Sequence, residues 1–184
     1  DSIKKEKKAK VLAAREAKGT RRDAYQVLAN AVLPVTAAVF YFVTGKPVFL
    51  LPFVAGMAEA LADTAASAIG VLSSSAFDLF RFRKCERGIS GGMSWLGTSA
   101  ALVCAFALSF FTCLFGSVTP TAALLAACVA FLGSIFDSFL GSLFQVKYRC
   151  KVCRRLTEKT ECHGMKTERV GGIPFFDNDL VNLF

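Results

Sequence analysis

Charged residues are scarce along most of this sequence, and their scarcity excludes an ordinary soluble domain. Of the 184 residues, 20% are charged, 54% are hydrophobic and 18 are Phe, and the mean hydropathy is +0.48. Soluble domains have about 45–50% apolar residues. No signal peptide is visible either, because the N-terminus is a basic run without an apolar core beside a small-residue cleavage site. The composition predicts an integral membrane protein.

Four apolar stretches are long enough to cross a bilayer as helices, which takes about 20 residues each. The expected spans are about 24–44, 48–73, 96–116 and 121–145. They predict an all-α fold, a polytopic transmembrane helix bundle with at least four spans and a short cytoplasmic Cys/His loop. A basic segment, 1–23, precedes one transmembrane domain, 24–184, with polar loops 74–95 and 146–176. The chain begins with Asp1 and ends in what resembles the start of an apolar segment, so we expect a fragment of a longer chain.

Basic residues are almost absent from one side of these spans. On one side, nine basic residues precede Ala24, four lie in 73–90 and eight lie in 147–169. The other side holds only Lys46. By the positive-inside rule, the basic side is cytoplasmic. The net charge of +8 therefore reflects topology and lipid contact, and it does not indicate nucleic acid.

The second expected span contains an acid on a stripe of small polar residues. On a helix, Asp63, Ser67 and Gly70 lie one turn apart on one face, with Thr64 beside them. An ionisable group at membrane depth costs roughly 3 kcal/mol or more and usually lines an enclosed or watered cavity. The alternative is a helix-packing face with one buried, neutral Asp.

The fourth expected span repeats this pattern. One helical face carries Ser134, Asp137, Ser138, Gly141 and Gln145. Asp63 lies ten residues before Ser73 and Asp137 lies ten residues before Lys147, so both should be roughly 15 Å inside the cytoplasmic helix ends. Two carboxylates at one level suit a divalent cation with room for water and phosphate. A shared-proton carboxyl pair and the proton or cation relay of a transporter remain open.

Two other segments carry groups typical of ligand or metal sites. The run from Gly91 to Gly97 precedes the third span, and backbone N–H groups of such a glycine-rich turn can hold phosphate, although a plain turn fits equally well. The loop after the fourth span carries Cys150, Cys153, Cys162 and His163. This spacing fits a tetrahedral zinc knuckle, and a reducing cytosol argues against disulfides. The adjacent Cys162 and His163 can both ligate only with a bent backbone, so unligated thiols remain the alternative.

Four segments, taken in order, resemble the integral membrane family called domain of unknown function 92. They are residues 62–70, 91–94 with Gly97, 137–141 with Gln145, and 177–182. The resemblance covers about Gln26 to Phe184. It departs at Ala68, where the family tends to have Glu, and at Ile89-Ser90, where it tends to have Asn or Asp before the glycine pair. The family includes transmembrane protein 19 and the plant phytyl phosphate kinases, and it is distantly similar to phytol and dolichol kinases.

The resemblance implies phosphoryl transfer from a nucleoside triphosphate, with CTP as one option, to a prenyl or polyprenyl monophosphate at the cytoplasmic face. Asp63, Asp137 and Asp177 would be catalytic and would hold Mg²⁺. The expected substrate- and phosphate-binding residues are Thr64, Ser67, Gly70, Gly91, Gly92, Ser94, Ser138, Gln145, Asn178 and Asn182. Four basic residues of the first polar loop would attract the nucleotide: Arg81, Arg83, Lys84 and Arg87.

The expected partners are a membrane lipid and a nucleoside triphosphate, without nucleic acid, and a homo-oligomer is left open. Two other classes of function also remain open. One is an ion- or proton-coupled transporter that uses Asp63 and Asp137, although their spans run the same way and do not form an inverted repeat. The other is a non-catalytic membrane scaffold whose loop zinc recruits a partner.

Overall fold

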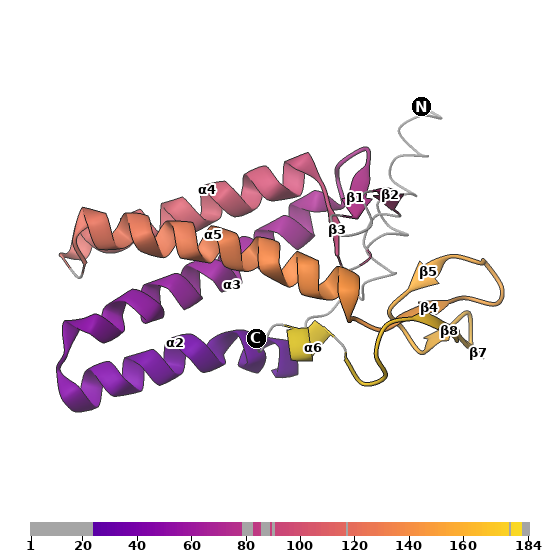
Figure 1. Cartoon of the computed structure of the whole chain (residues 1–184), viewed down its shortest axis with the longest axis horizontal. Helices are drawn as coiled ribbons and strands as arrows, with labels where there is room; N and C mark the ends of the chain where they lie inside the picture. Colours follow the sequence, from indigo (N-terminus) through magenta and orange to yellow (C-terminus); the bar gives the residue numbers. More distant parts are fainter. Residues whose placement is uncertain are drawn as a thin grey trace.

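The computed structural model describes residues 24–78, 83–85, 89, 91–116, 118–176 and 178–181, and for residues 24–26, 83, 178 and 179 it describes the backbone alone. Within these ranges, four long helices pack side by side (Figure 1): α2 (Ala24–Thr44), α3 (Leu50–Gly70), α4 (Trp95–Phe111) and α5 (Pro120–Leu143). Short 3₁₀ turns, η1 (Pro47–Phe49) and η2 (Thr112–Phe115), adjoin α3 and α4. All four helices are long and apolar enough to cross a membrane, which confirms the predicted fold class. The basic segment 1–23 lies outside the described residues.

Helix α3 is the centre of the bundle, because it contacts α2, α4 and α5. Its contacts are made by small side chains. Ala58 and Ala62 of α3 pack with alanines of the two neighbouring helices, Ala101, Ala105 and Ala130. At Gly97 of α4, an added Cβ would come within 2.8 Å of the Ala66 carbonyl oxygen. Small residues let membrane helices approach closely, so this interface is typical of a bilayer protein.

Large apolar side chains lie on the outside of the bundle instead of in its core. Phe42 is 90% exposed and Leu114 is 79% exposed. In water such a surface would be costly, at about 25 cal/mol per Å² of apolar area. In a bilayer the same side chains contact lipid, so the inverted pattern follows from the solvent in which the helices fold.

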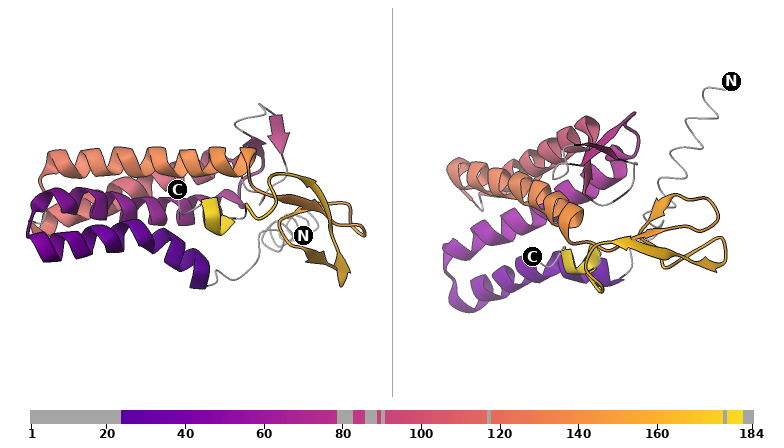
Figure 2. Two further views of the ribbon diagram at one scale, coloured as in Figure 1. Left: turned by 60° about the horizontal axis from the view of Figure 1, so that its bottom comes forward. Right: turned by 45° about the vertical axis from the view of Figure 1, so that its right-hand side comes forward.

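The polar loops lie at one end of the bundle, opposite the turns near Gly45 and Gly116 (Figures 1 and 2). The first loop forms an antiparallel sheet in the order β2-β1-β3, built from β1 (Ala76–Asp78), β2 (Arg83–Cys85) and β3 (Gly92–Met93). A four-residue helix, α6 (Asn178–Val181), contacts α2 and α5.

We name residues 147–171 the Cys/His module. It contains a second sheet in the order β5-β4-β8 and a separate hairpin, β6-β7. The strands are β4 (Lys147–Arg149), β5 (Leu156–Thr157), β6 (Glu161–Cys162), β7 (Met165–Lys166) and β8 (Glu168–Gly171). The sequence had predicted loops without strands here. Outside the helices, these short ladders supply partners for backbone N–H and C=O groups.

Two helices end earlier than the apolar pattern predicted. Helix α3 ends at Gly70 and α5 ends at Leu143, whereas the expected spans ran to 73 and 145. Asp63 and Asp137 therefore lie about 10 Å inside the helix ends, instead of the expected 15 Å, at 1.5 Å per residue. The two acids keep a common depth, because both helices lose a similar length.

Candidate functional site

A cavity of about 80 Å³ lies between α3, α4 and α5 at the end of the bundle that carries the sheets. It brings together nine of the residues expected from the sequence: Asp63, Ser67, Gly70, Gly91, Gly92, Ser94, Asp137, Ser138 and Gln145. One water molecule needs about 10–15 Å³ of such volume, so the cavity has room for about six waters. A phosphate group or a hydrated cation fits this space.

The acids of the cavity come from two different helices. Asp63 of α3 and Asp137 of α5 are both half-buried and lie close enough to interact electrostatically. The Asp137 side chain also shares a hydrogen bond with Glu59, one turn before Asp63 on α3. The structure therefore brings three carboxyl groups together at this level of the bundle: Glu59, Asp63 and Asp137.

Glu59 was not among the site residues expected from the sequence. The signal was its position four residues before Asp63 on the same helix. A second signal is Gly133 of α5, where an added Cβ would come within 2.9 Å of the Glu59 Cγ atom. The absence of a side chain at Gly133 is what lets the Glu59 stem lie between the helices.

Ser94 joins the end of α3 to the start of α4. Its hydroxyl accepts a hydrogen bond from the Gly97 N–H at 3.1 Å, as an N-cap, and donates to the Gly70 carbonyl at 3.3 Å. Ser138 is also engaged, because its hydroxyl donates to the Ser134 carbonyl at 3.2 Å. Both hydroxyls hold parts of the cavity wall together. A bound phosphate would share them with these protein partners.

The glycine loop enters the cavity beside the end of α5. Gly91 has φ +83°, a conformation that side chains rarely adopt, and a Cβ there would overlap the backbone of Ser142. Gly91 is therefore required for close approach of the loop, whether or not its N–H groups also hold an anion.

Gln145 is the most unusual group in the cavity wall. Its side chain is 2% exposed, and its Oε1 has no hydrogen-bond partner among the described residues. A buried polar atom left in that state costs about 1–3 kcal/mol. A ligand or a water that donates a hydrogen bond to Oε1 would remove this cost, so the residue points to an occupied cavity.

Several expected site residues are not part of the cavity. Thr64 is not among the residues that line it, and its hydroxyl donates to the Ala60 carbonyl at 2.6 Å. Lys84 is exposed. Arg81, Arg87, Asp177 and Asn182 lie outside the described residues, as do the side chains of Arg83 and Asn178. The buried Val181 of α6 does line the cavity, which brings this C-terminal segment next to the acids.

Two charged residues that the sequence placed in polar loops are buried. Asp78 is 4% exposed and Lys147 is 7% exposed. The Ser142 hydroxyl donates to the Asp78 carboxylate at 2.5 Å, and the Lys147 ammonium donates to the Ser142 carbonyl at 3.2 Å. Ser142 thus joins the first sheet to the Cys/His module at the end of α5. No sequence signal distinguished these two charges from their exposed neighbours.

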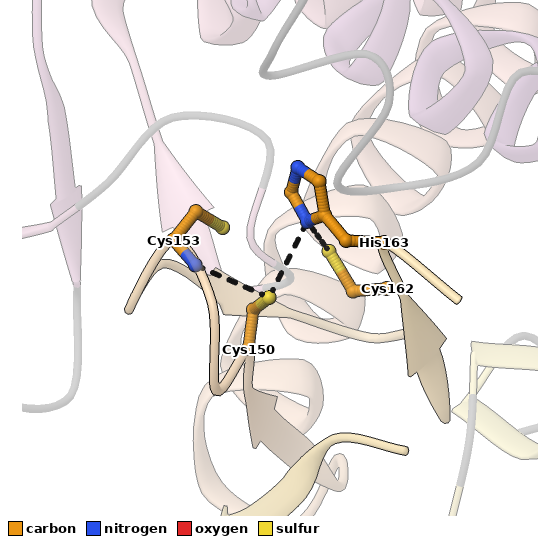
Figure 3. A group of neighbouring side chains, drawn as sticks. All are labelled: Cys150, Cys153, Cys162 and His163. Atoms are coloured by element: carbon orange, nitrogen blue, oxygen red, sulfur yellow. Dashed lines mark hydrogen bonds between the residues drawn. The ribbon is translucent and has the colours of Figure 1, made fainter. Parts of the chain in front are cut away.

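The Cys/His module gathers the four predicted metal ligands (Figure 3). One ligand atom from each of Cys150, Cys153, Cys162 and His163 lies within 4.8 Å of the other three. His163 Nδ1 lies 3.5 Å from Cys150 Sγ and 3.1 Å from Cys162 Sγ. In a tetrahedral zinc site, bonds of 2.0–2.3 Å separate sulfur and nitrogen ligands by about 3.5 Å. The arrangement therefore fits a tetrahedral metal ion.

The bent backbone that adjacent ligands require is present at His163. His163 has φ +55° and Gly164 has φ +70°, and together they form the two-residue turn between β6 and β7. Paired positive φ values are typical of the tight turns that join two antiparallel strands. This turn allows the side chains of Cys162 and His163 to face the same point.

Local hydrogen bonds shift the pKa values of the Cys150 and Cys162 thiols in opposite directions. The Cys153 N–H donates to Cys150 Sγ at 3.5 Å, and this bond lowers the pKa of the Cys150 thiol to about 6. The hydrogen bond to Cys150 raises the pKa of Cys162 to about 11. Since the thiolate is the form that binds metal, Cys150 is prepared as a ligand at neutral pH.

A bundle of four long apolar helices, two of which carry acids that line one cavity, defines a polytopic integral membrane protein. The chain belongs to the integral membrane protein family DUF92, whose profile matches residues 2–184. The family resemblance given by the four sequence segments is thereby confirmed.

Three curated relatives are similar to parts of this chain. The uncharacterized membrane protein MJ0933 of Methanocaldococcus jannaschii is 32% identical over 130 residues, or 70% of this chain and 53% of that protein. Protein VTE6, chloroplastic, of Arabidopsis thaliana is 31% identical over 100 residues, or 54% of this chain and 30% of that protein. Protein PGR of the same plant is 29% identical over 132 residues, or 65% of this chain and 45% of that protein. The chain thus spans about half the length, or less, of these relatives. No solved structure matches it.

Proposed function

We propose that this protein is a membrane-embedded phosphotransferase that moves a phosphoryl group from a nucleoside triphosphate to a prenyl or polyprenyl monophosphate at the cytoplasmic face. One observation carries the proposal: two acids from separate apolar helices share a phosphate-sized cavity with a glycine loop and the buried Gln145 amide. The family resemblance supports the same chemistry, because the family includes plant phytyl phosphate kinases.

Asp63 and Asp137 would hold Mg²⁺, together with Asp177, whose place in this set rests on the family resemblance. Mg²⁺ held by these carboxylates would supply positive charge that offsets the negative charge developing on the phosphates during transfer. Ser67, Ser94 and the backbone of the glycine loop would bind phosphate oxygens. An oxygen of the lipid monophosphate would form the new bond to the γ-phosphorus, and the bond to the β,γ-bridging oxygen would break and release the nucleoside diphosphate. The attacking oxygen is already anionic, so no protein base is needed.

We expect the parts of the two substrates to lie in different environments. The phosphates would lie in the cavity beside Asp63 and Asp137, and the base and ribose would lie among the basic loops. The prenyl tail would lie in the bilayer against the exposed apolar side chains of the bundle. Only the reacting phosphates would meet inside the protein, where low water content strengthens electrostatic interactions.

We also propose that Cys150, Cys153, Cys162 and His163 bind one structural Zn²⁺ ion. Soft thiolates with one imidazole are typical zinc ligands, and the four ligand atoms lie within 4.8 Å of one another. Elemental analysis of protein purified under reducing conditions should find one zinc per chain. Absence of zinc from folded protein would refute this assignment.

The function is tested by incubating purified protein in lipid nanodiscs with prenyl monophosphates of several chain lengths and labelled CTP or ATP. Transfer of label to the lipid in the presence of Mg²⁺ is the expected result, and the Asp63→Asn variant is the matched inactive control. Label transfer that is equal in the variant would reject the site. A protein that transfers no label but moves ions or protons across proteoliposomes, with loss of transport in the same variant, would instead be a transporter.

A further inference from the structure

Gln145 is held between two hydrogen bonds that cross from a distant segment. The chain leaves α5 at Leu143, passes through residues 144–146 and enters the Cys/His module at Lys147. On one side of Gln145, the Ile173 N–H donates to the Phe144 carbonyl at 2.8 Å. On the other side, the Val146 N–H donates to the Phe176 carbonyl at 2.9 Å. The segment 172–176 therefore fixes the backbone on both sides of Gln145.

At Gly172, this segment lies directly against the Gln145 backbone. It has φ +80°, and an added Cβ would overlap the Gln145 carbonyl group. The neighbouring Gly171 has nothing within 4 Å of the corresponding position. The contact is thus specific to Gly172, and it determines where the Gln145 backbone lies.

The Cys/His module connects the two chain segments, 144–146 and 172–176, that these hydrogen bonds join. Lys147, two residues after Gln145, pairs with Gly171, one residue before Gly172, through β4 and β8. The ligand Cys150 directly follows β4, and its N–H donates to the Arg155 carbonyl at 2.9 Å. A metal ion held by the four ligands would therefore be linked, through β4 and β8, to both chain segments that adjoin Gln145.

We propose that the Cys/His module is a positioning element for the cavity: by ordering β4 and β8, its metal ion holds the Gln145 amide at the phosphate-binding site. The inference rests on the proposed function for the role of Gln145 and on the proposed zinc for the ordering. Gln145 Oε1 would then accept a hydrogen bond from a donor group, such as water, that enters the cavity with the substrate. Gly172 and the zinc ligands act through Gln145 and touch no substrate.

The first test follows hydrogen exchange in nanodisc-embedded protein, with zinc content measured by elemental analysis. Removing zinc with a chelator should increase exchange in peptides that contain Val146, Ile173 and Phe176, and adding zinc back should restore protection. A peptide across Gly45 and Lys46, at the opposite end of the bundle, should not change. Unchanged exchange around Gln145 after verified zinc loss would overturn the inference. This readout needs no substrate, so it stands apart from the test of the phosphotransferase activity.

The second test uses matched glycine variants and the kinetics of phosphoryl transfer. Gly172→Ala should keep its zinc and raise KM for the nucleotide or the lipid phosphate roughly tenfold, the size of one net hydrogen bond. Gly171→Ala controls for position, and Gly116→Ala, at φ +64° with nothing within 4 Å, controls for backbone strain. Partial unfolding would lower kcat at constant KM, so a rise in KM separates positioning from general damage.

Gln145→Ala completes the experiment because it removes the group that is positioned. The variant should keep zinc and raise KM as much as Gly172→Ala does. In the Gln145→Ala background, Gly172→Ala should then add little, since both act through one side chain. Fully additive effects, or an unchanged KM in Gln145→Ala, would overturn the inference even if phosphoryl transfer itself is confirmed.

Discussion

The cavity and the Cys/His module both gather polar side chains near one end of the helix bundle, but they draw them from very different lengths of chain. The module takes its four ligands from residues 150–163, on strands and turns that are close in sequence. The cavity takes its lining from Asp63 to Val181, on four helices and a loop. A short closed segment costs little loop entropy, whereas the cavity exists only when the whole bundle has packed.

This difference predicts how each region responds to substitution. Loss of one metal ligand should first change the structure of the Cys/His module. It should change the cavity only through the position of Gln145. Loss of a packing contact between α3, α4 and α5 should change the cavity directly and leave the metal site intact. The following variants test that separation.

The largest effect is expected for Asp63→Asn, which removes a charge from the cavity. Phosphoryl transfer should fall by roughly 100-fold or more, the usual loss when one preorganised electrostatic group is removed. The amide keeps the volume and relieves the cost of a buried charge, so the protein should remain folded in membranes. Activity is measured with labelled nucleotide over a range of Mg²⁺ concentrations, and zinc content should not change.

Asp137→Asn should behave like Asp63→Asn, and the double variant should be little worse than either single variant, because residues that act as one metal site are not additive. Wild-type transfer by Asp63→Asn at low Mg²⁺ would show that the carboxylate is not a metal ligand.

Cys153→Ser should weaken metal binding in the Cys/His module. Removing a partner that only supports a metal ligand typically costs 10–100-fold in affinity, so loss of a direct ligand should weaken zinc binding by more than roughly 100-fold. Competition with a coloured chelator measures this loss. Cys128→Ser is the matched control, because Cys128 is an exposed thiol on α5 outside the module. Equal zinc retention in the two variants would contradict the assignment.

Gly91→Ala tests the packing that closes the cavity. The new Cβ overlaps the Ser142 backbone and holds a residue at φ +83°, so the free energy of unfolding should fall by about 1–3 kcal/mol. Gly116→Ala carries a similar positive φ with open space around it, and the difference between the two variants isolates the overlap. Both are compared by thermal unfolding in detergent, and equal unfolding midpoints would show that the loop can move away from Ser142.

Thr64→Ala should have the smallest effect. The Thr64 hydroxyl donates to the carbonyl one turn earlier and does not line the cavity, so removing it leaves no cavity group without a partner. We expect stability to change by less than about 0.5 kcal/mol and KM for both substrates to stay at the wild-type value. A tenfold rise in KM would instead show that Thr64 contributes to phosphate binding, as the sequence predicted.

The class of protein, the number of described spans and the two acids could be predicted from the sequence alone. Charge scarcity over about 20 residues allows a helix to cross the bilayer, and the fixed helical rise put Asp63 and Asp137 at one depth even though both helices ended early. The Cys150 to His163 spacing also sufficed to predict a metal site, because its ligands are joined by short turns.

The tertiary structure decided which groups face each other. Helical periodicity gives the angle between two side chains of one helix, but the rotation of that helix against its neighbours depends on packing of small residues such as Ala58 and Ala62. That rotation placed Glu59 against Asp137, left Thr64 outside the cavity and buried Gln145 in it. The contact of Gly172 with Gln145 joins residues 27 positions apart through a folded module, so no local sequence pattern could contain it.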